Sequence, residues 1–230
     1  MDDNDISEDT KVNIVATGDF STAELSSIFT SYDDDISVVA MKRITAISCE
    51  EALSLALNVL NGDAEDATDE KCIAAFLGFA AYCESNSNTE TGKVQMSTEK
   101  KQSIISLIKT LYATSSNERI KDQAIYALAR IADYDLFAYI IESEDIDFDL
   151  KVTTVERNIG LLLEIIASET ALSEKMDIII DAMEILPVAE VGEALQLAVD
   201  EGRLDADESV SNVIDYIEAE GLEGIYKYEK

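Results

Sequence analysis

Hydrophobic and polar positions follow the period of an α-helix along most of the chain. From residue 21 onward, apolar side chains recur three and four positions apart, which places them on one face of a helix. Short polar stretches separate these patterns into individual helices. The helices predicted in this way cover residues 21–31, 34–47, 49–60, 69–84, 98–113, 117–132, 134–143, 149–168, 173–186, 188–200 and 207–220.

Residues that start and stop helices support these boundaries. Ser21 stands three positions before Glu24, and Ser48 three before Glu51, so both pairs fit a capping box that satisfies free backbone N–H groups. The run Asp33–Asp35 is expected to cap the helix that follows it. Glycine and asparagine tolerate the left-handed conformation at a helix end, and proline cannot continue a helix. Helix ends are therefore predicted at Asn61–Gly62, Gly202 and Pro187.

The chain is predicted to be all-α, with consecutive helices packed as antiparallel neighbours because the loops are short. Before the first predicted helix, residues 11–20 are expected to be a short strand or an extended lead-in, with Val12, Ile14 and Val15 as its apolar residues. The predicted parts are an acidic mobile or extended N-terminal segment (1–20), a helical repeat domain (21–220) with a flexible polar loop near 85–97, and a C-terminal tail (221–230).

One helical pattern recurs at a nearly constant interval. Ile120, Ala124, Leu128 and Ile131 form a stripe with offsets of 4, 8 and 11 residues. Three other segments have the same offsets. The four stripes start at intervals of 36, 48 and 35 residues, and the longest interval contains the 85–97 loop. Fixed-period similarity of this kind is typical of repeat architectures. The other stripes are Ile36, Ala40, Ile44 and Ile47; Cys72, Phe76, Ala80 and Cys83; and Val155, Ile159, Leu163 and Ile166.

The segment from Asn117 to Ile131 resembles the second helix of a HEAT-like (armadillo/HEAT-type) repeat. It starts with an amide and has Ile120-Lys121 where the family has Val-Arg, followed by Ala124 and Leu128. This resemblance implies an α-solenoid in which stacked helix pairs complete each other's cores. The alternative is an irregular all-α bundle. The family motif specifies packing and no reaction.

The composition excludes most catalytic chemistry. The 230 residues include no His and no Trp. A Ser-His-Asp triad, a Cys-His dyad and a His-ligated metal site are therefore excluded. We expect a protein without enzymatic activity, catalytic residues or a cofactor. The cysteines are Cys49, Cys72 and Cys83, and their odd number argues against a disulfide framework. We interpret them as small, buried apolar side chains.

One acidic segment resembles an EF-hand calcium loop. Asp145, Asp147, Asp149 and Glu156 fall at loop positions 1, 3, 5 and 12. Position 6 of such a loop requires a positive φ and is normally glycine, whereas this chain has Leu150 there. The competing interpretation is an acidic helix start that complements the helix dipole. We favour the helix start and predict no metal ligands.

The charge is large and unevenly distributed. The chain carries 48 acidic against 17 basic residues, a net charge of −31. Residues 93–130 are the exception, with seven Lys and Arg against three acids. This basic segment could be a docking surface for an acidic partner or an internal contact with an acidic part of the chain. The candidate partner-binding residues are Lys100, Lys101, Lys109, Arg119 and Lys121.

This charge would repel nucleic-acid phosphates and anionic lipids, so no direct binding to either is expected. Three explanations for the acidity remain: adaptation to a high-salt host, attraction to a basic partner protein, or mimicry of nucleic acid. No apolar run is long enough for a membrane helix, and the N-terminus lacks signal-peptide features, so a cytoplasmic location is expected. We predict a non-enzymatic protein-binding adaptor or scaffold. The alternatives are an acidic inhibitor that mimics nucleic acid and a calcium-responsive helical module.

Overall fold

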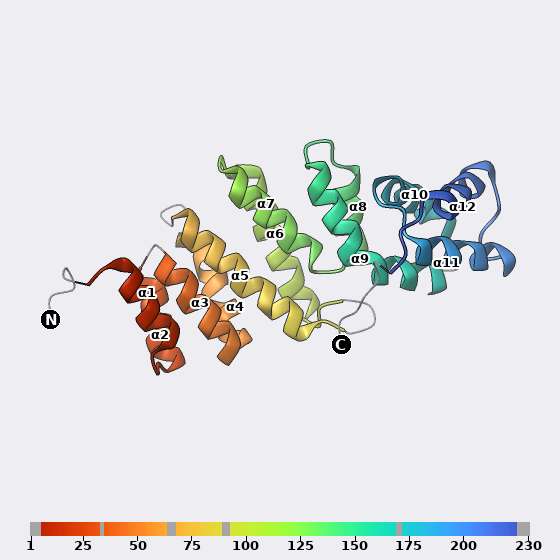
Figure 1. Cartoon of the computed structure of the whole chain (residues 1–230). Coiled ribbons are helices and arrows are strands. Elements are labelled where there is room, and N and C mark those ends of the chain that lie inside the picture. The colour runs from red at the N-terminus through yellow and green to blue at the C-terminus, as the bar shows by residue number, and fades with distance from the viewer. Residues whose placement is uncertain (1–5, 33–34, 64–67, 89–92, 169–171, 225–230) are drawn as a thin grey trace. The chain divides into compact units, whose positions relative to one another are not determined.

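The computed structural model describes residues 6–32, 35–63, 68–88, 93–168 and 172–224 (Figure 1). Over these residues the all-α prediction is confirmed, since the regular structure is helical and only two isolated β-bridges occur. The α-helices are α1 (Glu8–Thr17), α2 (Thr22–Ser31), α3 (Asp35–Ile47), α4 (Cys49–Asn58), α5 (Asp69–Asn86), α6 (Thr98–Thr114), α7 (Glu118–Ala129), α8 (Tyr134–Glu142), α9 (Phe148–Ser168), α10 (Met176–Ile185), α11 (Ala189–Asp200) and α12 (Glu208–Glu220).

The strand or extended lead-in expected at residues 11–20 is wrong, because α1 occupies most of this segment. Ser7 caps α1 by accepting a hydrogen bond from the backbone N–H of Thr10. At the other end, the Arg43 guanidinium donates to the carbonyl oxygens of Val15 and Gly18, at 2.8 and 2.6 Å. These last carbonyls have no partner inside their own helix. A residue from α3 thus completes a helix whose own apolar pattern is weak.

The predicted caps are confirmed at Ser21 and half confirmed at Ser48. Ser21 and Glu24 form a complete capping box. The Ser48 hydroxyl accepts from the Glu51 backbone N–H as expected, but the Ser48 N–H donates to the carbonyl of Ile44. The Glu51 carboxylate instead accepts from the Ser26 hydroxyl at 3.1 Å. In the capping box predicted at Ser48, the bond to the Glu51 carboxylate is therefore replaced by a contact between α4 and α2.

The helix ends follow the predicted residues at two of three positions. Gly202 has a φ of +71°, and the N–H groups of Gly202 and Arg203 bond to carbonyls of the last turn of α11, as in a Schellman motif. α10 ends two residues before Pro187. The α-helix α4 ends at Asn58 and continues as one π-helical turn, Val59–Asp63. The end expected at Asn61–Gly62 falls inside that turn.

The chain forms two compact units, which we describe separately. Unit 1 contains residues 1–86 and 96–127, and unit 2 contains residues 87–95 and 128–230. The predicted helical domain, 21–220, includes residues of both units. Parts of the predicted N-terminal segment, of the 85–97 loop and of the 221–230 tail lie outside the described residues. Within the described part of the tail, Leu222 forms a parallel bridge with Val188.

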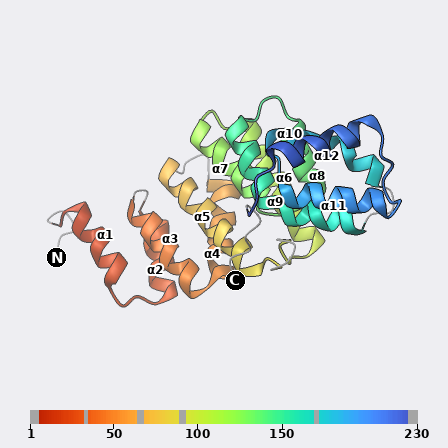
Figure 2. The ribbon, with the colours of Figure 1, turned by 45° about the vertical axis from the view of Figure 1, so that its right-hand side comes forward.

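Unit 1 is built around α3, which packs against α1, α2, α4 and α5 (Figure 2). Phe29, Met41 and Phe79 are fully buried in its core. Gly78 lies where α5 approaches its neighbours closely: a Cβ atom there would be 2.8 Å from the Met41 sulfur and 3.1 Å from the carbonyl oxygen of Ala52. A glycine at this position lets three helices meet.

Unit 2 is built around α9, which packs against α8, α10 and α11. The polar side chain of Asn158 is buried in this unit, at 2% exposure. Its amide donates to the carbonyl of Ala129 at 3.0 Å, at the end of α7, and to that of Thr154 at 2.8 Å. The buried amide thereby caps the last residue of a neighbouring helix.

The three cysteines are free thiols, as predicted, but they are not equally buried. Cys72 and Cys83 lie in the core, whereas Cys49 is half-buried. Burial, and then the charge of Asp69, raises the pKa of the Cys72 thiol. The thiolate is the nucleophile, so we expect iodoacetamide to label Cys49 well before the other two in the folded protein. Peptide mass spectrometry after timed labelling measures this order, and equal labelling rates would contradict the burial described here.

Candidate functional site

The candidate partner-binding residues lie in unit 1, on α6 and on the part of α7 that belongs to this unit. Lys100, Lys101 and Lys109 belong to α6, and Arg119 and Lys121 belong to α7. The basic segment 93–130 does not belong to one unit, because Lys93 and Arg130 are part of unit 2. The segment that looked continuous in sequence is thus divided between two folded bodies.

Several of these cations contact acids of their own unit. The Lys100 ammonium lies 3.5 Å from the Glu50 carboxylate and 4.6 Å from the centre of the Tyr82 ring. In unit 2, the Lys93 ammonium lies 2.7 Å from the Glu164 carboxylate. Both acids lie far from their lysines in sequence. For these two lysines, the contacts favour the internal interpretation of the basic segment over a docking surface.

The segment that resembles a calcium loop is folded as a helix start. α9 begins at Phe148, so Asp149 and Glu156 are helical residues. Asp147 accepts a hydrogen bond from the backbone N–H of Asp149 at 2.9 Å. This contact agrees with the interpretation of the segment as an acidic helix start. No group of three or more His, Cys, Asp or Glu side chains that could hold a metal occurs in the described parts of the chain. Of the Asp33–Asp35 run, only Asp35 lies within the described residues, as the first residue of α3.

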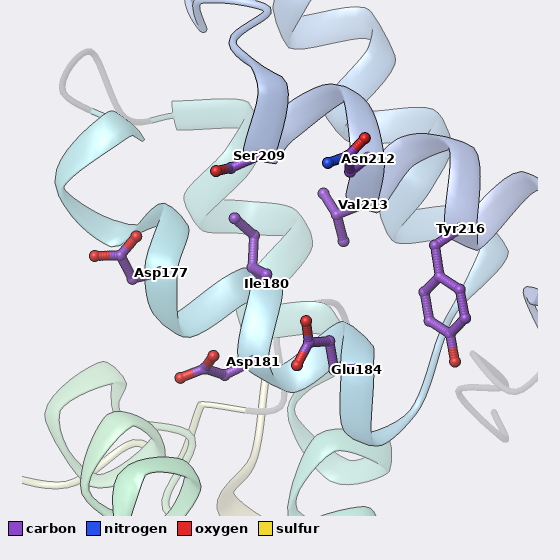
Figure 3. Close-up of a pocket in the computed structure, with 8 residues that line it drawn as sticks. All are labelled: Asp177, Ile180, Asp181, Glu184, Ser209, Asn212, Val213 and Tyr216. Atoms are coloured by element: carbon purple, nitrogen blue, oxygen red, sulfur yellow. The ribbon is translucent and has the colours of Figure 1, made fainter.

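One candidate site is an open groove of about 530 Å³ in unit 2, between α10 and α12 (Figure 3). We call it the α10/α12 groove. Six of its eight lining residues are exposed, so the groove is an open surface feature, not an enclosed chamber. It is lined by Asp177, Ile180, Asp181 and Glu184 from α10 and by Ser209, Asn212, Val213 and Tyr216 from α12.

The helical period of each wall explains which side chains reach the groove. Both helices bury an apolar stripe in the core of unit 2 and turn the residues beside it outward. α12 starts at a defined place because the Asp207 carboxylate accepts from the backbone N–H of Val210 at 2.9 Å. The buried stripes include Met176, Ile179, Ala182 and Met183 on α10 and Val210, Val213, Ile214 and Ile217 on α12.

The two walls of the groove differ in charge. α10 contributes three carboxylates, from Asp177, Asp181 and Glu184, at spacings of four and three residues. α12 contributes neutral polar side chains and the ring of Tyr216, which is 40% exposed. Half-buried Ile180 and buried Val213 form an apolar floor. In Figure 3, Ile180 points from α10 toward α12, and Val213 points back toward α10. No Lys or Arg is found among the residues that the structure describes around this groove.

The start of α10 lies in a region of negative potential. Burial, followed by the charges of Glu142, Asp135 and Asp177, raises the pKa of the Tyr134 hydroxyl, because each disfavours a further negative charge. The ammonium of Lys175 lies 4.7 Å from the centre of the same ring. Of these acids, Asp177 also lines the α10/α12 groove.

A second acidic groove, of about 390 Å³, lies between α11 and α12. We call it the α11/α12 groove. Leu197 on α11 is 54% exposed beside it. The two helices approach closely at Gly192, where a Cβ atom would lie 2.7 Å from a methyl group of Ile217. Its acids come from both sides: Glu193 and Asp200 from α11, and Glu218 and Glu223 from α12 and the residues after it. Among the described residues, neither groove is lined by a basic residue or a cysteine.

These grooves offer carboxylates, neutral hydrogen-bonding groups and apolar surface, which together suit a cationic partner with apolar side chains.

The comparisons with known proteins find no matching family model, no matching curated protein and no matching solved structure. Among the helices of the described residues, none is both long and apolar enough to cross a membrane.

The groove residues were not among the sequence-based candidates. A signal was present, since Asp177, Asp181 and Glu184 fall on one face of a predicted helix. That signal does not identify the opposite wall. The opposite wall is α12, and the whole of α11 separates it from α10 in the sequence.

Proposed function

We propose that this chain is a non-enzymatic interaction protein, an adaptor or scaffold, that binds a basic segment of another protein. The observation that carries the proposal is the pair of open grooves beside α12, whose described lining consists of carboxylates, neutral polar groups and apolar side chains without a basic residue. A partner rich in Lys and Arg would be attracted by the net charge of −31 and held where apolar side chains can also be buried.

We further propose that the helices are stacked as HEAT-like pairs. In unit 2, α10 packs against both α8 and α12, while α9 packs against α11. The consecutive pairs α8 and α9, α9 and α10, and α11 and α12 also contact each other. In unit 1, α3 contacts α1 and α5 in the same way. Contact with the neighbours one and two positions along the chain is what stacked helix pairs require. In the proposed stack, α8, α10 and α12 form one layer, and the α10/α12 groove lies between two helices of that layer.

The proposed function predicts selective binding of basic peptides. The probe is a fluorescein-labelled helical peptide of about 15 residues, built from Lys, Leu and Ala, long enough to form some helix by itself. Its control is the same peptide with Glu in place of Lys. We expect the full-length chain to raise the anisotropy of the basic probe at micromolar concentration and to leave the acidic one free. Binding should weaken as the salt concentration rises from about 0.1 M to about 1 M, where the Debye length falls to about 3 Å.

Equal binding of the two peptides, or binding of neither, would overturn the proposed function. Displacement of DNA from an unrelated DNA-binding protein, without selectivity between the peptides, would favour nucleic-acid mimicry instead. If salt adaptation alone explains the acidity, high salt should stabilise the fold strongly while neither peptide binds.

A further inference from the structure

We infer that the α10/α12 groove binds one amphipathic helix of a partner protein. In this inference, which rests on the proposed function, the partner helix carries Lys or Arg at positions i, i+4 and i+7, beside a row of apolar side chains. The basic stripe faces α10, the apolar row faces Ile180 and Val213, and a neutral face meets α12.

The spacing of the acids determines the spacing of the partner's basic residues. Asp177, Asp181 and Glu184 lie along one face of α10 and span about 10 Å at a rise of about 1.5 Å per residue. A partner helix lying along α10 in the same chain direction has the same rise, so basic residues at the same intervals meet all three carboxylates. A partner with basic residues at other intervals meets fewer of them.

The floor supplies the apolar contact. Ile180 is only half-buried, and its side chain faces Val213 across the groove (Figure 3). Covering this apolar surface removes it from water, which contributes about 25 cal/mol per Å². Because the groove is open along its length, it accepts a row of side chains from a helix better than it encloses a small molecule. Recognition of an amphipathic helix by an apolar groove is a common binding mode.

The neutral wall orients the partner. Ser209, Asn212 and Tyr216 offer hydrogen bonds and an exposed aromatic ring, and none carries a charge at neutral pH. Since only one wall is acidic, the basic stripe of the partner is drawn toward α10.

The charge pattern of this chain argues against a second copy as the occupant. No two Lys or Arg residues in the sequence are four positions apart, so none of its own helices carries the required basic stripe. Two copies would also each bring a net charge of −31 to the contact. The partner is therefore a different protein.

The test compares two variants with the same change of net charge. Asp177→Asn, Asp181→Asn and Glu184→Gln together neutralise the acidic wall of the α10/α12 groove. The matched control, Glu193→Gln, Asp200→Asn and Glu218→Gln, removes the same charge from the α11/α12 groove. The probe is a helical peptide with Lys at i, i+4 and i+7 and Leu on the adjoining face. Exposed ion pairs contribute about 0.2–1 kcal/mol each, so we expect the first variant to weaken binding by about tenfold. The control should weaken it by less than about threefold.

A second peptide of the same composition, with its Lys residues moved to i, i+2 and i+5, should bind the unaltered chain about tenfold more weakly than the probe. Circular dichroism confirms that the variants remain folded.

If the two variants weaken binding equally, or if the Lys spacing has no effect, the groove assignment is overturned while the proposed function stands. A greater loss in the control variant would also overturn it. Failure of the unaltered chain to distinguish basic from acidic peptides would overturn the proposed function itself. A stable dimer blocked by the first variant, measured by sedimentation, would contradict the choice of partner.

Discussion

Gly78→Val is expected to destabilise unit 1 by about 3 kcal/mol. The first added carbon would already lie 2.8 Å from the Met41 sulfur and 3.1 Å from the carbonyl oxygen of Ala52. The Met41 side chain is fully buried, and the Ala52 oxygen belongs to the backbone of α4 and cannot move aside without that helix. Overpacking of a core costs about 1–3 kcal/mol and sometimes more. Valine recovers only about half a kcal/mol through its better helix propensity.

Ser85→Val is the matched control for Gly78→Val, because Ser85 is an exposed residue of the same helix. It should change stability by less than about 0.5 kcal/mol. Urea unfolding followed by circular dichroism, with hydrogen exchange of α5 peptides to locate the effect, measures both variants. The double variant with Met41→Ala should lose less than the sum of the two single changes. Equal stability of the Gly78 and Ser85 variants would show that α5 does not pack as closely as described.

Asn158→Leu is expected to destabilise unit 2 by about 2 kcal/mol. The substitution keeps the size of the side chain but removes both amide hydrogen bonds, including the one to the Ala129 carbonyl at the end of α7. A buried carbonyl left without a partner costs about 1–3 kcal/mol. Thr154→Val is the matched control, since the buried Thr154 hydroxyl donates only to the Leu150 carbonyl of its own helix. It should cost about 1 kcal/mol or less.

Asn158→Asp adds a pH dependence with a defined sign. A carboxylate at this buried position faces carbonyl oxygens and cannot donate to them, so its folded pKa should lie above the ordinary value of about 3.9. The protonated acid can donate again. Stability of this variant should therefore be highest at low pH and should fall as the pH rises through the folded pKa. Urea unfolding at several pH values measures this trend, and a variant that matches Asn158→Leu at every pH would contradict the role of the amide.

The helices could be predicted from the sequence because their signals are local. Apolar stripes, the Ser21 cap, Gly202 and Pro187 each act within a few residues, and the observed boundaries follow them closely. The sequence-based predictions fail where a residue distant in the sequence determines the local structure. α1 is completed by Arg43, and the Ser48 box is replaced by a bond from α2 to Glu51. The fourth residue of one predicted stripe, Ile47, is 54% exposed because α3 ends there.

The candidate site was less predictable than the fold for the same reason. A groove depends on which helices become neighbours, and this follows from packing across the unit. The acids of α10 could be found in the sequence, but Val213 and Tyr216 on the opposite wall could not be connected to them. The basic segment gave a clear signal in composition, yet Lys100 and Lys93 are occupied by acids of their own units. Net charge by segment does not show which charges already have partners.

Methyl NMR of the full-length chain tests the central claim most directly. With Ile and Val methyl groups labelled, addition of the basic helical probe should shift the signals of Ile180 and Val213, the floor of the α10/α12 groove. The signals of Ile104 and Ile108, buried in α6 beside the basic candidates Lys100, Lys101 and Lys109, should stay in place. Shifts confined to α6 and α7, or an unchanged spectrum under conditions where the probe is bound, would contradict the claim that the acidic groove of unit 2 holds the partner.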